Sequence, residues 1–123
     1  MYPSPPNPFL MMKLMIPVLM EYVYQVIAAA APSIPFYYYH IPGLTGVHEP
    51  MDEFYALAIK DIPSFRGIKY SSIDVVTLGS CLKIRKNYPQ HEIFWGTDEA
   101  IIIAIDHGME CAIGSTYNMA RDL

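Results

Sequence analysis

The stretch Arg66-Gly67-Ile68-Lys69-Tyr70-Ser71-Ser72 decides how the rest of this 123-residue chain is interpreted. Residues 66–70 have the pattern of a short β-strand between two helical segments. A lysine is unusual in a buried strand, because removing an ammonium group from water is costly unless the group is paired or neutral. Lys69 is therefore either a strand-end lysine that reaches water or a lysine held neutral so that its amine attacks a ketone.

Strand and helix patterns alternate outward from this stretch. The predicted strands are residues 36–40, 66–70, 92–95 and 111–113. The predicted helices are residues 16–31, residues 50–61, a helix capped by Ser71, and a helix that begins at Asp98 and ends at Gly108. Regular alternation of this kind implies parallel strands joined by helical crossovers.

Composition narrows the class of protein. Hydrophobic residues make up 53% of the chain and charged residues 16%, which indicates strands buried on both faces or a missing partner surface. The formal net charge of −4 argues against binding to nucleic acid or to an anionic membrane. Cys81 and Cys111 are typical of free thiols in a cytosolic protein, with a disulfide as the alternative. The sequence contains no zinc, calcium or Gly-rich phosphate motif, so we expect no metal.

The N-terminal third is the most ambiguous part of the sequence. The apolar run at residues 9–20, followed by alanines at 28–31, resembles a signal peptide. No basic residue precedes the run, however, and it is interrupted by Lys13, Pro17 and Glu21. A helix that spans residues 16–31 and ends at Pro32 fits the pattern better than a secretion signal or a membrane span, so we expect a cytoplasmic protein.

Polar residues gather at the carboxyl ends of the predicted strands. The carboxyl ends of successive predicted strands carry, or are followed by, Tyr39, Lys69, residues 96–99 and residues 114–116. Parallel α/β folds place their active sites at that end of the sheet. The shared location favours a catalytic Lys69 over a lysine that only reaches water.

Four motifs contain these strand ends: residues 36–46 (FYYYHIPGLTG), 67–71 (GIKYS), 94–99 (FWGTDE) and 114–118 (GSTYN). Together they resemble the N-acetylneuraminate lyases, which belong to the pyruvate-dependent aldolase superfamily that includes dihydrodipicolinate synthase. The resemblance implies an α/β fold, a partial (β/α)8 TIM barrel that holds roughly strands 5–8 and the helices between them. Residues 16–123 would form this half-barrel, after an irregular Pro-rich N-terminus at residues 1–15.

The resemblance also implies roles for individual residues. Lys69 matches the lysine that forms a Schiff base with the keto carbon, and Tyr39 matches the tyrosine that shuttles a proton near the substrate carboxylate. The positions that match substrate-binding residues are Ser71, Gly96, Asp98, Glu99 and Ser115. Because the covalent imine on Lys69 is the electron sink, the resemblance implies no cofactor and no metal.

Each of these residues also has a purely structural interpretation. Tyr39 could be one more aromatic residue of its strand. Asp98 and Glu99 could be ordinary acidic residues at the start of a helix, where the helix dipole favours them. Ser71 and Ser115 could be helix caps and nothing more.

The activity expected from the resemblance is aldol cleavage of N-acetylneuraminate, a sialic acid, to N-acetylmannosamine and pyruvate. The family's Gly-rich segment for the substrate carboxylate is absent from this sequence, so we expect the chain alone to be inactive or nearly so. The alternatives are a non-catalytic half-barrel that associates with a full-length aldolase, or another keto-acid aldolase of the same superfamily. Relatives are usually tetramers, which implies a homo-oligomer for the full-length form.

Overall fold

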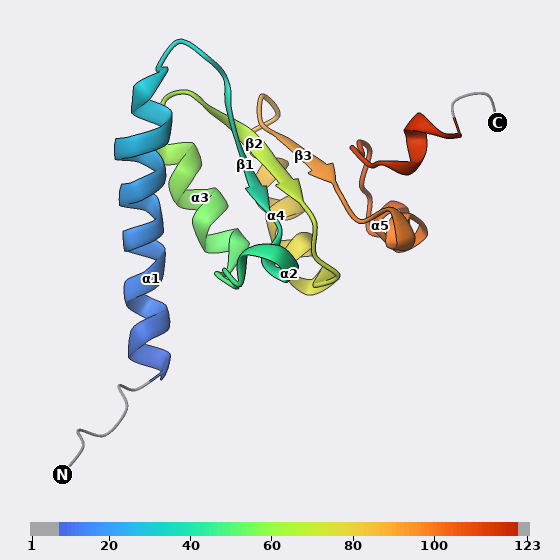
Figure 1. Ribbon diagram of the computed structural model, residues 1–123, viewed down its shortest axis with the longest axis horizontal. Helices are drawn as coiled ribbons and strands as arrows, with labels where there is room; N and C mark the ends of the chain where they lie inside the picture. The colour runs from blue at the N-terminus through green and yellow to red at the C-terminus, as the bar shows by residue number, and fades with distance from the viewer. Residues whose placement is uncertain (1–7, 121–123) are drawn as a thin grey trace.

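The computed structural model describes residues 8–120, which form a parallel three-stranded sheet with helices packed against it (Figure 1). The strands, in spatial order, are β1 (Phe36–His40), β2 (Phe65–Tyr70) and β3 (Glu92–Trp95). The longer helices are α1 (Pro8–Tyr22), α3 (Met51–Asp61) and α4 (Val75–Arg85). Figure 1 shows α3 next to α1, and α3 also packs against α4. The first three predicted strands and their parallel crossover connections are therefore confirmed.

The fourth predicted strand, at residues 111–113, is reduced to a single bridge between Trp95 and Ala112. The Trp95 N–H donates to the Cys111 carbonyl at 2.9 Å, and the Ile113 N–H donates to the Trp95 carbonyl at 2.8 Å. Directly after this bridge, Gly114 packs against the side chain of Asp98. The strand prediction is wrong in extent because β3, the partner strand, itself ends at Trp95 and leaves only one residue pair to form.

The N-terminal helix begins earlier than the sequence indicated. Because α1 starts at Pro8, the irregular segment predicted for residues 1–15 is wrong for residues 8–15, while residues 1–7 lie outside the described part of the chain. Proline is well tolerated in the first turn of a helix, where its nitrogen needs no intrahelical partner. The chain continues as a π-helical turn (Val23–Ile27) and a 3-10 turn (Ala28–Ala30). Among the described helices, none is long and apolar enough to cross a membrane.

The cap of α4 is Asp74 and not Ser71. The Asp74 Oδ1 atom accepts a hydrogen bond from the Thr77 N–H at 3.1 Å. Ser71 directly follows β2 and is still bonded to β1, because its N–H donates to the His40 carbonyl at 2.8 Å. The interpretation of Ser71 as a helix cap is therefore wrong, since the helix cannot begin until the chain has left the ladder.

Shorter elements follow β1 and β3. α2 (Pro42–Thr45) follows β1. After β3, a 3-10 turn (Asp98–Ala100) leads into α5 (Ile101–Asp106), and Gly108 follows with a φ of 88°. This left-handed glycine is the helix end that the sequence predicted. A last 3-10 turn covers Thr116–Asn118.

Alternation along the strands separates the two faces of the sheet. The last residues of the strands, His40, Tyr70 and Trp95, are aligned in register and buried. The Tyr70 and Trp95 rings stack with centroids 6.2 Å apart, and the His40 ring lies 5.1 Å from Tyr70. The residues directly before them, which are Tyr39, Lys69 and Phe94, are also aligned and face the opposite side.

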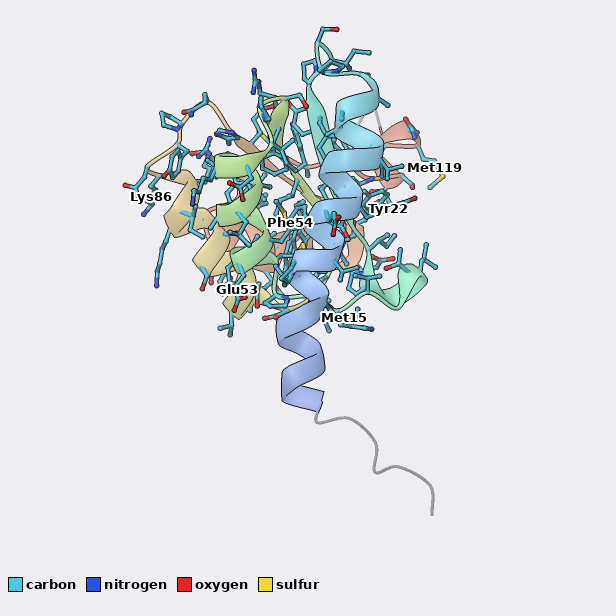
Figure 2. All side chains as sticks on the ribbon, turned by 90° about the vertical axis from the view of Figure 1, so that its left-hand side faces the viewer. Met15, Tyr22, Glu53, Phe54, Lys86 and Met119 are labelled. Carbon is cyan, nitrogen blue, oxygen red and sulfur yellow. The ribbon has the colours of Figure 1, made fainter. Side chains whose placement is uncertain are left out.

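The first helix packs on one edge of this core. Ile16 and Met20 of α1 are buried, and so is Val23 at the start of the following π-helical turn. Met15 and Tyr22, which Figure 2 labels along α1, are 44% and 57% exposed. α1 therefore contributes one apolar side to the core and leaves a second one open to solvent.

Candidate functional site

A cavity of about 480 Å³ lies at the carboxyl ends of the strands. The predicted site residues that line it are Tyr39, Lys69, Gly96, Asp98, Glu99 and Ser115. Ser71 is the one predicted site residue outside this lining. Elements far apart in the sequence therefore bring the predicted residues to one place, because parallel strands end at the same edge of a sheet.

Lys69 and Tyr39 are direct neighbours on the open face of the sheet. They are paired in the register of β1 and β2, so their side chains leave the sheet on the same side. The Lys69 Nζ atom lies 4.4 Å from the centre of the Tyr39 ring. Lys69 is half-buried, whereas Tyr39 is 46% exposed. The lysine thus lies against a phenol at the mouth of the cavity, and this packing argues against a side chain that simply extends into water.

Gly96 lies where the ends of β2 and β3 approach each other closely. A Cβ atom at Gly96 would lie 2.0 Å from the Ser71 Oγ atom and 2.9 Å from the Lys69 Cε atom. The Gly96 N–H donates to the Tyr70 carbonyl at 2.9 Å, which keeps the backbone beside β2. Only a residue without a side chain leaves room for the Lys69 methylene chain at this point.

Ser71 lies behind Gly96, and its hydroxyl is not in the cavity lining. Its Oγ atom is buried and has no hydrogen-bond partner among the described residues. The structure therefore places Ser71 next to the site, while its predicted contact with substrate stays a prediction.

The Asp98 carboxylate is fixed by the loop after the last bridge of the sheet. Its Oδ2 atom accepts hydrogen bonds from the Thr116 N–H at 2.9 Å and from the Thr116 hydroxyl at 3.0 Å. The Thr116 N–H and hydroxyl hold the pKa of the Asp98 carboxyl below its usual range, with smaller effects from the Ser115 N–H and the charge of Lys69. Asp98 is consequently an anionic acceptor at neutral pH.

Glu99 and Ser115, the other predicted site residues, make no side-chain hydrogen bond among the described residues. Glu99 is exposed at the cavity wall. Ser115 occupies the N-cap position of the last 3-10 turn, but its hydroxyl makes no capping hydrogen bond, so its structural interpretation as a helix cap is wrong. Cys81 and Cys111 are both free thiols, as expected. The described residues contain no group of three or more side chains arranged to bind a metal ion.

Sequence reasoning assigned no site role to several residues of the cavity wall, which are Ile113, Gly114, Thr116 and Asn118, although it placed residues 114–116 at a strand end. Thr116 lies inside a motif that the sequence singled out, and its polar side chain was the available signal. Ile113 gives no such signal, because an apolar residue in a strand pattern predicts only burial.

Comparison with known proteins identifies the family to which this geometry belongs. The model of the dihydrodipicolinate synthetase family matches residues 7–123. The chain belongs to this family. It is 41% identical over 92 residues to N-acetylneuraminate lyase A of Xenopus laevis, and this match covers 75% of the chain and 29% of the relative.

Solved structures agree with this family assignment. The N-acetylneuraminate lyase from Aliivibrio salmonicida matches with a TM-score of 0.76 and 42% identity, and the enzyme from Proteus mirabilis with a TM-score of 0.76 and 38% identity. Both matches cover 85% of this chain and 34% of the other. The partial (β/α)8 barrel predicted from the motifs is thereby confirmed, and the chain spans about a third of the length of these family members.

Proposed function

We propose that this chain carries the imine-forming side of an N-acetylneuraminate lyase site, with Lys69 as nucleophile and Tyr39 as proton shuttle. The observation that supports this most directly is the Lys69 amine 4.4 Å from the centre of the Tyr39 ring, at the cavity whose wall holds Asp98 and Glu99. A phenol beside a reacting amine can donate or accept a proton. Carboxylates suit a hydroxyl-rich ligand, because each buried hydroxyl needs a partner.

In the proposed reaction, the neutral Lys69 amine attacks the keto carbon of open-chain N-acetylneuraminate, and water leaves as the imine forms. Tyr39 accepts the proton of the hydroxyl on the second carbon beyond the imine carbon. The bond between this hydroxyl-bearing carbon and the carbon next to the imine then breaks. N-acetylmannosamine leaves, and the electron pair stays on the lysine adduct as an enamine. Protonation of the enamine carbon and hydrolysis of the imine release pyruvate and restore the amine. The protonated imine is the electron sink, so the scheme uses no metal and no organic cofactor.

Orientation of the keto acid is the weak point of the chain as it stands. The Gly-rich segment that binds the substrate carboxylate in the family does not occur in these 123 residues. Misplacement of a reacting group by an ångström costs on the order of a hundredfold in rate. We therefore propose that efficient cleavage needs a complete barrel, in a cytoplasmic homo-oligomer, and that the chain alone forms the imine slowly.

The test is to complete the barrel and ask for a covalent imine. Residues 28–123 are joined to the preceding part of the Xenopus laevis lyase, and the product is treated with pyruvate and borohydride. We expect a reduced pyruvate adduct at Lys69 that the variant K69A lacks and that K60A, which removes an exposed lysine on α3, retains. An intact, folded barrel without any adduct at Lys69 would contradict the proposal.

Two further readouts separate the proposal from its alternatives. Cleavage of N-acetylneuraminate by the completed barrel supports the lyase, whereas condensation of aspartate semialdehyde in its place would assign another keto-acid aldolase. If the completed barrel is inactive, and the 123-residue chain changes the activity of a full-length lyase on mixing, the chain is a non-catalytic partner.

A further inference from the structure

The Asp98 carboxylate and the Thr116 side chain join two neighbouring strand ends across the cavity rim. Asp98 follows β3, and Thr116 follows the bridge residue Ala112. Both hydrogen bonds from Thr116, at 2.9 Å and 3.0 Å, end on the same oxygen, Oδ2. One residue therefore holds this carboxylate through its backbone and its side chain together.

Gly114 makes this contact possible. A Cβ atom at Gly114 would lie 1.6 Å from the Asp98 Oδ1 atom and 2.8 Å from the Oδ2 atom. Any side chain at Gly114 would occupy the volume of the carboxylate and push it away from Thr116. The loop at residues 114–116 is thus shaped around one orientation of Asp98.

We propose that Thr116 is a positioning residue for substrate, which holds the Asp98 carboxylate in the orientation that accepts hydroxyl groups from the sugar part of the ligand. This inference rests on the proposed lyase function. A carboxylate offers about four lone-pair positions, and Thr116 occupies two of them on one oxygen. The remaining positions stay available at the cavity wall, because Asp98 and Thr116 both line the cavity.

Fixing the carboxylate in advance increases affinity for a polyol. A side chain that is already held in its bound conformation loses less rotamer freedom when the ligand arrives. The fixed charge also matters, because a carboxylate only accepts hydrogen bonds and therefore selects hydroxyl donors. Thr116 would set sugar affinity without taking part in imine formation at Lys69.

The experiment uses the 123-residue chain with a carbon-13 label on its aspartate side chains. The titration of the Asp98 carboxyl carbon and the binding of N-acetylmannosamine are followed by NMR in the wild type, T116V, T116S and D98N. Valine has the shape of threonine without its hydroxyl, while serine retains the hydroxyl. The matched control is T45V, since the Thr45 hydroxyl donates to the carbonyl of Ile41, the residue before α2, and Thr45 does not line the cavity.

We expect T116V to titrate Asp98 at a higher pH and to weaken N-acetylmannosamine binding by about five- to tenfold. T116S is expected to stay within about twofold of the wild type, and T45V is expected to match it. D98N should weaken binding at least as much as T116V.

Two results would overturn the inference: an Asp98 titration that is the same in T116V and wild type, or a sugar affinity that T116V leaves intact while D98N abolishes it. A wild-type chain that binds no N-acetylmannosamine would also overturn the sugar role. Failure of the proposed lyase is a separate observation, since it is read from the absence of an adduct at Lys69 in the completed barrel.

Discussion

The two faces of the sheet differ in exposure at the strand ends, although consecutive residues build them. His40, Tyr70 and Trp95 on the helix side are 4%, 1% and 1% exposed. Tyr39, one position before His40, is 46% exposed and lies against Lys69. At the carboxyl ends of the strands, side-chain alternation places a packed core on one face and the candidate site on the other. The position of the candidate site residues therefore depends on the covered face, which fixes the strands.

The pKa values of groups in the core and at the cavity are shifted by different causes. On the covered face, burial lowers the pKa of His40 to about 4 and raises the pKa of the Cys81 thiol to about 12. On the open face, hydrogen bonds from Thr116 lower the pKa of Asp98. Desolvation favours neutral groups within the core, whereas directed donors favour a charge at the cavity.

The largest expected effect is a loss of folding stability, and it is tested by truncating one phenylalanine on each face of the sheet. Phe65 is fully buried, with ring centroids of Tyr55 and His91 both 5.8 Å away. We expect F65A to lower the free energy of unfolding by about 3–5 kcal/mol, because it leaves a cavity in the core. F94A on the open face should cost less than half of that, since Phe94 is only half-buried. Urea unfolding of both variants measures the difference, and equal losses would show that the open face is also core.

The next effect concerns two glycines. G96A should lower the free energy of unfolding by up to about 3 kcal/mol, because the new methyl group meets Ser71 Oγ and Lys69 Cε at 2.0 Å and 2.9 Å. G79A is the matched control: Gly79 lies inside α4 with open space at its Cβ position, so alanine should stabilise the chain by about 0.5–1 kcal/mol. In the completed barrel, G96A should also reduce imine formation at Lys69. Unchanged stability in G96A would contradict the tight packing at the strand ends.

The smallest expected effect is a dependence on pH from the covered face. The pKa of His40 is about 4 in the folded chain, below its ordinary value of 6.5, so the unfolded chain binds more protons between these values. Stability from the neutral imidazole is present above pH 6.5 and is lost as the pH falls, by about 2 kcal/mol between pH 7 and pH 5. H40F should lose less stability over this range than the wild type.

His91 is a second buried histidine that contributes to the same pH dependence. Burial lowers its pKa as well, so H91F should remove a separate part of the same acid sensitivity. Urea unfolding at several pH values measures both. If H40F and the wild type lose the same stability on acidification, His40 is not the buried group responsible.

Much of the fold could be predicted from local patterns. The aromatic run before Pro42 and the run that ends at Trp95 predicted strands that the structure confirms. Local pattern failed where tertiary contacts compete with it. The segment at residues 111–113 has a strand pattern, but its partner β3 ends at Trp95, so the pairing stops at a single bridge. Ser71 fits a capping motif, but its backbone is still bonded to His40.

The candidate site was predictable in its members more than in its contacts. Motif resemblance assigned Lys69, Tyr39 and Asp98 to one rim, and the structure places all three at one cavity. The role of Thr116 was not accessible in this way, because it depends on a hydrogen bond between residues 18 positions apart. Gly96 was expected to bind substrate, whereas the structure adds a steric reason for its presence.

The sequence by itself determined the alternation of strands and helices and the residue types at the strand ends, because these follow from local periodicity and covalent order. The tertiary structure alone decided which of those residues touch. The Lys69 amine against the Tyr39 ring and the Asp98 carboxylate on Thr116 depend on strand register and on close approach at two glycines. Such contacts between distant segments are fixed by packing, which no local pattern records.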